Sequence, residues 1–308
     1  MNDILSFYIK SPHVFFNDQS ETFSNADFVI LGVPMDYTSS FRPGSRFAPQ
    51  EVRRLSNELE SYCIDVDMDF DLLRVCDLGD LIIGFDVATT LKRLTRVIGE
   101  LIAKDKFFIV IGGEHTITLG EVLALMSTYE NLKVIILDAH MDLREEYPIG
   151  LKTSHATVVR RTGEKIGFEN ILVLGVRAVS GEEINFCKKE NFNGYLTSNT
   201  IHSDFDFVEK TLMKFLKPKD YVLLSIDMDV IDPAFAPGVS NPEPLGLTPI
   251  TVMEIIRMIT NSSANLVGLD VVEVSPPYDI SGVTSLLASR IIKNTLCYVA
   301  RRKLMKVI

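Results

Sequence analysis

The sequence contains no long apolar run and no secretory signal pattern. No apolar stretch in the 308 residues approaches the ~20 residues that a membrane-spanning helix needs. The first residues, Met1-Asn2-Asp3-Ile4, lack the basic and then apolar layout of a signal peptide. We therefore expect a cytoplasmic protein without a membrane partner.

Cysteine pairs and an excess of positive charge are also lacking. The four cysteines, Cys63, Cys76, Cys187 and Cys297, lie far apart and form no CxxC pair, so they fit reduced, partly buried thiols better than disulfides or a zinc site. The formal net charge is −10, which argues against a nucleic-acid partner because phosphate binding needs clustered lysine and arginine. This acidity suits a cationic ligand, although solubility alone explains it equally well.

No break in composition marks a domain linker, and no repeat recurs with a fixed period. The length allows either one large α/β domain or two smaller ones. With 46% hydrophobic residues, the chain can bury a large core. These properties are ordinary for a globular enzyme and leave the domain count open.

Strand-length apolar segments alternate with segments that have helical spacing. One apolar stripe at helical spacing consists of Leu91, Leu94, Val97, Ile98, Leu101 and Ile102. Thr248 followed by Pro249 is typical of a helix start. The expected strands are 28–33, 107–111, 134–137, 171–176, 221–226 and 266–274, and the other expected helices are 49–59, 119–129, 204–215 and 250–260. This alternation predicts an α/β fold with a mostly parallel sheet covered by helices on both faces.

Metal-capable side chains follow several of these strands. After 134–137 and after 221–226 they stand at alternate positions, and side chains at i and i+2 of an extended chain point the same way. The carboxyl ends of parallel strands are also where ligands collect in α/β sheets. The candidate metal ligands are His115, Asp138, His140, Asp142, Asp227 and Asp229. Two imidazoles and four carboxylates are too many for one ion and suit two, with Mn²⁺ favoured over structural zinc.

The motifs around these ligands resemble the ureohydrolase family (arginase, agmatinase and relatives), and most closely its agmatinase branch. They are Gly112-Gly113-Glu114-His115-Thr116, Asp138-Ala139-His140-Met141-Asp142, Ser154-His155-Ala156-Thr157, the segment 225–238 that includes Asp227-Met228-Asp229, and Glu273-Val274-Ser275-Pro276-Pro277-Tyr278-Asp279. The resemblance runs in family order from about residue 28 to residue 290. It implies a single three-layer α/β/α domain over residues 1–308, two Mn²⁺ ions per subunit, and a homo-oligomer that is a trimer or a hexamer.

The resemblance also implies a role for each metal ligand. It places His115 and Asp142 on one ion, His140 and Asp229 on the other, and the carboxylates of Asp138 and Asp227 between the two. Two cations lower the pKa of a water molecule between them, which gives a hydroxide nucleophile near neutral pH.

Three residues are candidates for the remaining chemistry. Glu273 is expected to hold the guanidinium group, because a carboxylate accepts paired N–H bonds. Asp142 can relay the proton of the hydroxide to the leaving amine, as its family counterpart is thought to do. His155 is the candidate general acid or proton shuttle.

The expected reaction is hydrolysis of agmatine to urea and putrescine. The residues after the first cluster, Arg144, Glu145, Glu146 and Tyr147, correspond to the place where family members contact the far end of the substrate. Arg144 would suit a carboxylate, whereas Glu145 and Glu146 would suit an amine, and side-chain direction decides between them. N1-aminopropylagmatine, guanidinobutyrate and arginine therefore stay open as substrates.

Two other classes of function fit the sequence less well. A non-catalytic metal-binding family member would lack a ligand or the shuttle histidine, and none is missing. A binuclear phosphate esterase would bind an anion, which the negative charge and Glu273 oppose. Departures from the family pattern are Glu114, Ala156, Ser240, Asn241 and Leu245; at Glu114 we expect an effect on orientation rather than on chemistry.

Overall fold

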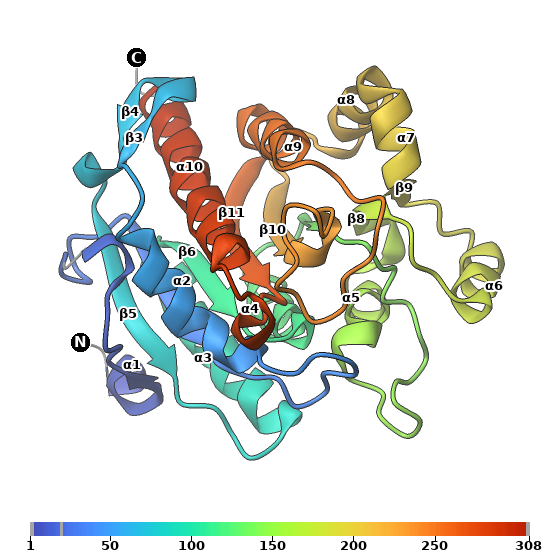
Figure 1. Cartoon of the computed structure of the whole chain (residues 1–308), viewed down its shortest axis with the longest axis horizontal. Helices are drawn as coiled ribbons and strands as arrows, with labels where there is room; N and C mark the ends of the chain where they lie inside the picture. Colours follow the sequence, from blue (N-terminus) through green and yellow to red (C-terminus); the bar gives the residue numbers. More distant parts are fainter. Residues whose placement is uncertain (1–2, 19–20, 306–308) are drawn as a thin grey trace.

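A nine-stranded sheet runs through the centre of the computed structural model, which describes residues 3–18 and 21–305 (Figure 1). The strand order is β1-β5-β2-β6-β11-β10-β7-β8-β9, and only the edge pair β1–β5 is antiparallel. The strands are β1 Ile9–Lys10, β2 Phe28–Val33, β5 Val75–Leu81, β6 Phe107–Gly112, β7 Leu132–Leu137, β8 Ile171–Val176, β9 Tyr195–Thr197, β10 Tyr221–Asp227 and β11 Asn265–Val272. A separate small hairpin joins β3 (Tyr62–Cys63) and β4 (Met68–Asp69).

Helices cover both faces of the sheet. One face carries α2 (Ala48–Ser56), α7 (Ser198–Ser203), α8 (Phe205–Phe215), α9 (Pro249–Asn261) and α10 (Val283–Met305). The other face carries α1 (Asp3–Tyr8), α3 (Val87–Ala103), α4 (Thr118–Leu125), α5 (Val158–Ile166) and α6 (Gly181–Glu190). The predicted three-layer α/β/α fold with a mostly parallel sheet is confirmed.

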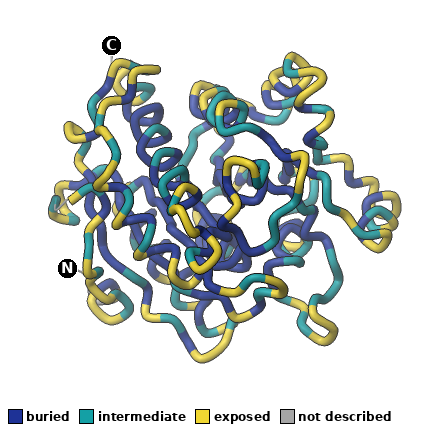
Figure 2. The backbone as a smooth tube through the Cα atoms, in the orientation of Figure 1, coloured by how far each residue is buried: buried dark blue, intermediate teal, exposed yellow. Residues whose placement is uncertain are grey.

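The sheet separates two apolar cores because alternate residues of a strand face opposite sides. In β6, Ile109 and Ile111 pack into one core, whereas Phe108 and Val110 pack into the other. Figure 2 shows the strands as the buried interior and the exposed segments at the periphery. A strand buried on both faces reads as a continuous apolar run, which is why the six predicted strands were visible in the sequence.

The start of α9 follows its capping signal, whereas two helix ends differ from prediction. Thr248 caps α9 by accepting a hydrogen bond from the backbone N–H of Thr251. The segment predicted as helix 119–129 ends at Leu125 in α4, and Tyr129 beyond it stacks on Tyr221 with 4.0 Å between ring centroids. Likewise α2 ends at Ser56, whereas the prediction extended it to residue 59. Local spacing does not reveal where a tertiary contact replaces the last helical turn.

All four cysteines are free and buried, as expected. In the described part of the chain, no helix is long and apolar enough to cross a membrane.

Candidate metal centre

The predicted ligands lie at the carboxyl ends of four adjacent central strands. The sheet order places β6, β11, β10 and β7 side by side and parallel. His115 follows β6, the segment from Asp138 follows β7, Asp227 ends β10 and Glu273 follows β11. Because these strands end at the same edge of the sheet, residues up to 158 positions apart in the chain meet there.

Two residues of the site have a left-handed backbone conformation, and the chain turns away from the strand direction there. Asp142 has a φ of 49° and Glu273 has a φ of 64°. Such angles are uncommon for residues other than glycine, and strained conformations of this kind cluster at functional sites. Simple strand alternation therefore does not extend to Asp142, although its side chain still joins the cluster.

Two histidines face the aspartates through their Nδ1 atoms. The Nδ1 of His115 lies 3.1 Å from Asp138 Oδ2, 3.2 Å from Asp142 Oδ2 and 3.4 Å from Asp227 Oδ2. The Nδ1 of His140 lies 2.9 Å from Asp229 Oδ2 and 3.5 Å from Asp138 Oδ1. The two oxygens of Asp138 therefore point toward different histidines, so that two groups of potential ligands share this one carboxylate.

The cluster holds several buried acids, and no lysine or arginine side chain in the described residues forms a salt bridge with them. Burial raises the pKa of Asp142 to about 7 and that of Glu273 to about 8, because a carboxylate loses its hydration there. Within the cluster and Glu273, three buried polar atoms have no hydrogen-bond partner among the described residues: His115 Nδ1, Asp138 Oδ2 and Glu273 Oε2. Buried nitrogen and oxygen atoms with free lone pairs can act as ligands for divalent cations that prefer oxygen and imidazole.

Hydrogen bonds outside the cluster orient His115. The Ser225 hydroxyl donates to Asp270 Oδ1 at 2.6 Å, so its oxygen accepts from the N–H at His115 Nε2, which is 3.1 Å away. The Thr118 hydroxyl donates to Asp270 Oδ2 at 2.9 Å. This arrangement leaves the Nδ1 lone pair of His115 directed at the aspartates. Asp270 was not predicted, and its signal in the sequence is a lone acid within an apolar strand.

His155 lies beside the cluster at the start of the turn that leads into α5. Its Nδ1 is 3.0 Å from Thr38 Oγ1 and its Nε2 is 3.2 Å from Ser40 Oγ. The Tyr147 ring packs edge-on against it, with 5.9 Å between ring centroids. Burial, together with the nearby positive charge of His140, lowers the pKa of His155 to about 4, so the imidazole is neutral at pH 7. Thr38 and Ser40 were not predicted, because more than 110 residues separate them from His155.

A cavity of about 160 Å³ joins His155 to the metal cluster. Its lining residues are Ser40, His115, His140, Asp142, Arg144, Tyr147, His155, Ala156, Asp227, Asp229, Asn241 and Glu273. Glu145 and Glu146 are not among them. The Glu145 carboxylate instead pairs with Arg160, and their predicted contact with a substrate stays untested. Arg144 does line the cavity, with its guanidinium 5.0 Å from the centre of the Tyr147 ring.

The structure places four of the five residues that depart from the family pattern as follows. The carbonyl of Ala156 accepts the backbone N–H of Arg144, and the backbone N–H of Ser240 donates to the carbonyl of Glu273. Asn241 lines the cavity, whereas Leu245 is exposed and has a φ of 64°. Of these residues, Ala156 and Asn241 touch the space in which a substrate would lie.

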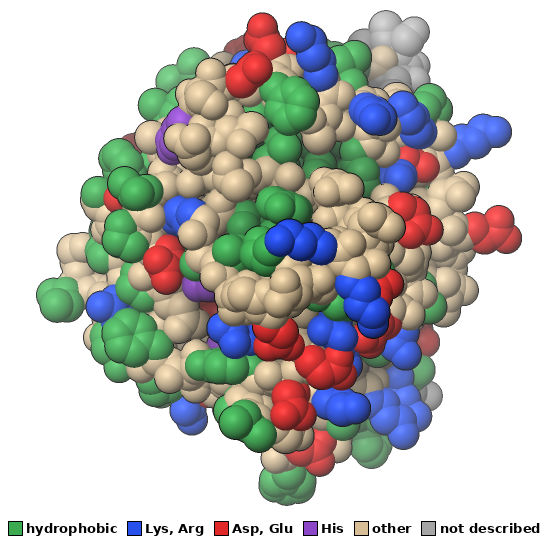
Figure 3. Space-filling model, turned by 90° about the vertical axis from the view of Figure 1, so that its right-hand side faces the viewer, with side chains coloured by type: hydrophobic (Ala, Val, Ile, Leu, Met, Phe, Trp, Pro, Cys, Tyr) green, Lys and Arg blue, Asp and Glu red, His purple; other side chains and the backbone are tan. Residues whose placement is uncertain are grey.

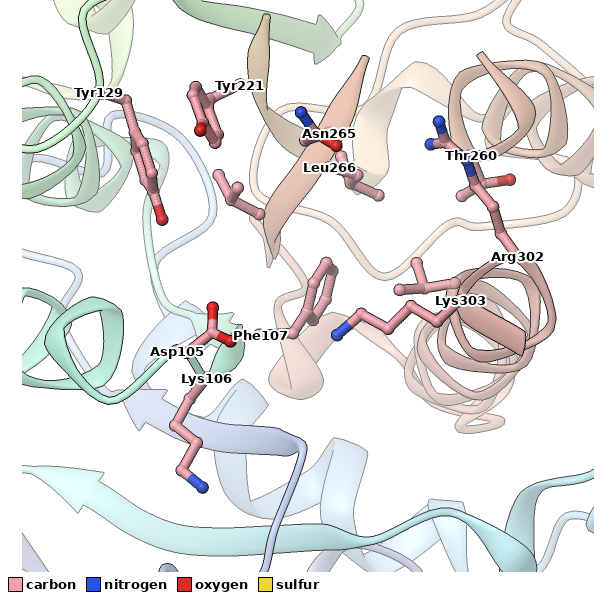
Figure 4. Close-up of a pocket in the computed structure, with 12 residues that line it drawn as sticks. Asp105, Lys106, Phe107, Tyr129, Tyr221, Thr260, Asn265, Leu266, Arg302 and Lys303 are labelled. Carbon is pink, nitrogen blue, oxygen red and sulfur yellow. The ribbon is translucent and has the colours of Figure 1, made fainter. Parts of the chain in front are cut away.

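Another cavity, of about 330 Å³, lies at the amino ends of the central strands, away from the aspartate–histidine cluster (Figure 4). Phe107, Tyr221 and Asn265 begin their strands there, and Arg302 and Lys303 approach from α10. The Arg302 guanidinium donates to the Ala264 carbonyl, and Lys303 lies over the Phe28 ring. Its lining contains no histidine, so it lacks the ligand set of the first cavity. On the outer face drawn in Figure 3, acidic and basic side chains are intermixed.

An aspartate–histidine cluster at the carboxyl ends of a parallel sheet is an arrangement that can hold divalent cations. Residues 26–297 match the model of the arginase family. An agmatinase of Bacillus cereus is 37% identical over 279 residues, which are 89% of this chain and 92% of the relative. A guanidinobutyrase of Pseudomonas aeruginosa is 34% identical over 299 residues, 94% of this chain and 90% of the relative.

A solved structure agrees with these sequence matches. The agmatine ureohydrolase of Thermoplasma volcanium superposes with a TM-score of 0.85 at 34% identity, covering 92% of this chain and 93% of that chain. The chain belongs to the arginase family, and it is a ureohydrolase. The resemblance seen in the motifs is thereby confirmed.

Proposed function

We propose that this ureohydrolase cleaves the guanidino C–N bond of agmatine and releases urea and putrescine. The observation that carries the proposal is a single cavity in which the aspartate–histidine cluster lies beside Glu273 and the neutral His155. Relatives named agmatinase, each at least 35% identical over about nine-tenths of this chain, support the choice of substrate.

The cluster is proposed to hold two Mn²⁺ ions. His115 and Asp142 would bind one ion, His140 and Asp229 the other, and the carboxylates of Asp138 and Asp227 would be shared. The donor set, rich in carboxylate with two imidazoles, supports manganese rather than structural zinc. When bound, two divalent ions make a nucleophile available near neutral pH because they lower the pKa of water.

Glu273 is proposed to hold the guanidinium group. Its Oε1 accepts the backbone N–H of His115 at 2.7 Å, which fixes the carboxylate, while Oε2 has no hydrogen-bond partner among the described residues. An N–H of the guanidinium can donate to Oε2, and a bound cation favours the ionised form of a carboxyl group whose pKa burial has raised.

Asp142 and His155 are proposed to handle the protons. Asp142 lies in the cluster and lines the cavity, where it can take the proton of the attacking water. His155 lines the same cavity, and its Nε2 can pass a proton to the leaving nitrogen.

A guanidino acid such as guanidinobutyrate is the second candidate substrate. Arg144 lines the cavity, whereas Glu145 and Glu146 do not, so the side chain at the outer part of the site is a cation. A guanidinium favours a substrate tail that ends in a carboxylate. The relative named guanidinobutyrase gives this alternative further support.

The test is urea release by the Mn²⁺-loaded protein from agmatine, guanidinobutyrate and arginine. We expect the highest kcat/KM with agmatine, and a higher value with guanidinobutyrate would transfer the assignment to guanidino acids. Arg144→Met should lower kcat/KM for guanidinobutyrate more than for agmatine, because only guanidinobutyrate has a carboxylate that would lose Arg144 as its partner. Absence of urea from every guanidino compound would overturn the proposed function.

Assembly and location stay proposals. The homo-oligomer rests on the family resemblance, and light scattering should give the mass of a trimer or hexamer. The four free thiols support a cytoplasmic location, since reduced cysteines suit that compartment.

A further inference from the structure

The buried hydroxyl of Thr38 connects a buried carboxylate to the candidate shuttle histidine. Thr38 Oγ1 lies 2.9 Å from Glu114 Oε1 and 3.0 Å from His155 Nδ1. The backbone N–H of His155 also points at this oxygen, at 3.1 Å. Thr38 and His155 are less than 10% exposed, and Glu114 is fully buried.

Counting donors fixes the direction of these hydrogen bonds. Glu114 receives the backbone N–H of Thr38 at 2.6 Å and the Thr116 hydroxyl at 2.7 Å, so it acts as an acceptor. A hydroxyl has one hydrogen to donate and two lone pairs to accept with. If Thr38 donates its hydrogen to Glu114, its lone pairs accept the backbone N–H and the Nδ1–H of His155. Every position on the Thr38 hydroxyl is then filled.

We propose that Thr38 and Glu114 are positioning residues that hold His155 as its Nδ1–H tautomer and thereby keep Nε2 available for proton transfer in the cavity. The proposal rests on the role given to His155 in the proposed function. With the hydrogen on Nδ1, the Ser40 hydroxyl, 3.2 Å from Nε2, donates to this nitrogen.

The same chain of hydrogen bonds stabilises the charged form of His155 during turnover. Nε2 accepts, by way of Asp142, the proton that the attacking water gives up, and passes it to the leaving nitrogen as the guanidino C–N bond breaks, so His155 begins and ends neutral. While His155 carries the charge, Nδ1–H donates to Thr38, which in turn donates to Glu114. Successive hydrogen bonds of this kind polarise one another, which favours the imidazolium.

Glu114→Gln should invert the tautomer without changing the size of the side chain. The backbone N–H of Thr38 needs an acceptor, so the amide oxygen of the glutamine takes the place of Oε2 and its NH₂ group takes the place of Oε1. The NH₂ group then donates to Thr38 Oγ1. The Thr38 hydroxyl is left to donate to His155 Nδ1, which places the hydrogen of the ring on Nε2.

The experiment compares kcat, KM, metal content and the pH profile of urea release for four variants of the Mn²⁺-loaded enzyme. We expect Thr38→Val and Glu114→Gln to lower kcat about 100-fold with KM within about twofold, since general acid–base catalysis contributes 10²–10⁴-fold. Thr38→Ser, which keeps the hydroxyl, should restore kcat to within about fivefold of wild type. The matched control is Thr162→Val, because Thr162 is a buried threonine whose hydroxyl has no hydrogen-bond partner among the described residues.

A double-mutant cycle with His155→Ala separates positioning from a structural effect. Residues that act through His155 should cause no further loss of kcat in the His155→Ala background. Losses that multiply, or a loss of bound metal that accounts for the lower kcat, would overturn the proposal. If Thr38→Val does not fold, Glu114→Gln decides the question in the same cycle.

The cycle also distinguishes this proposal from the proposed function. If wild-type enzyme releases urea and His155→Ala leaves kcat unchanged, the shuttle role of His155 fails, and the positioning role fails with it. If His155→Ala lowers kcat but Thr38→Val and Glu114→Gln do not, only the positioning role is wrong.

Discussion

Two buried clusters of charged side chains in the described part of the chain are built in opposite ways. In the first, the Arg53 guanidinium donates to both oxygens of Asp77, at 2.8 and 2.9 Å, and also contacts Asp80 at 2.5 Å. In the second, at the metal centre, four aspartates surround His115 and His140.

The difference lies in where the positive charge comes from. Arg53 is a permanent cation and nearly every polar atom around it is paired, including the Gly79 carbonyl at 2.9 Å. At the candidate metal centre only imidazoles among the described residues form salt bridges with the acids, and several polar atoms there are unsatisfied. Buried ion pairs that are complete are structural, whereas buried acids without a protein cation indicate a site for an external one.

The largest effect should follow from removal of a shared carboxylate. Asp227→Ala is expected to abolish both metal retention and urea release, because Asp227 faces the site of both ions in the proposed arrangement. His155→Ala should lose activity but keep its metal, because His155 lies outside the ligand set. Metal content by elemental analysis, measured beside urea release, checks both. Loss of metal in His155→Ala would count against its role as a shuttle.

The sequence predicted the cluster because strand ends are a local property. The apolar runs before Asp138 and Asp227 located the strands, and parallel pairing brought their ends together. The left-handed backbone of Asp142 and Glu273 was not predictable, since it depends on the loops that surround them. The metal ligands and their roles stay predictions until metal is measured.

Local sequence patterns could not predict which residues from distant parts of the chain contact the site. Nothing in the sequence around Thr38 indicates that it meets a histidine 117 residues away. Nor does the pair Arg53-Arg54 reveal that the first is buried and the second is 53% exposed. The Glu145 side chain likewise points toward Arg160, and only the fold determines this direction.

The second prediction breaks the complete cluster. Arg53→Met should lower the free energy of unfolding by about 3–5 kcal/mol, because it leaves the buried Asp77 without its cation. The neighbouring exposed pair supplies the control: Arg54→Met, which loses only the contact with Glu51, should cost less than about 1 kcal/mol. Chemical denaturation measures both, and metal binding should be unchanged in each. Equal costs would contradict the comparison of the two clusters.

The third prediction leaves the chain intact and withdraws the external cation. Chelation of Mn²⁺ should lower the free energy of unfolding by about 2.7 kcal/mol for each ion removed, relative to protein with free metal at 100 times the Kd of that ion. Arg53→Met should lose the same amount on chelation, because its cluster does not depend on the ion. Unfolding curves with and without chelator test this. A melting temperature that does not respond to metal would mean that the acids at the site need no cation.

The smallest expected effect concerns Lys293, a buried cation that lies outside both clusters. Its Nζ donates to the Leu59 carbonyl at 3.0 Å and to the Asn17 side chain, and burial lowers its pKa to about 8. An unfolded lysine has a pKa near 10.4, so between about pH 8 and pH 10 the unfolded state binds more protons. The contribution of Lys293 to the free energy of unfolding therefore rises with pH in that window.

Lys293→Met should remove this rise. Relative to wild type, the variant is expected to lose about 2 kcal/mol of its free energy of unfolding between pH 7.5 and pH 10. Lys189→Met is the control, because the Lys189 side chain is 81% exposed and should show no such difference. Denaturation midpoints at the two pH values give the comparison. If the two variants respond alike, the buried ammonium of Lys293 is as well solvated as one at the surface. Burial would then not be enough to tell a complete charge cluster from an incomplete one.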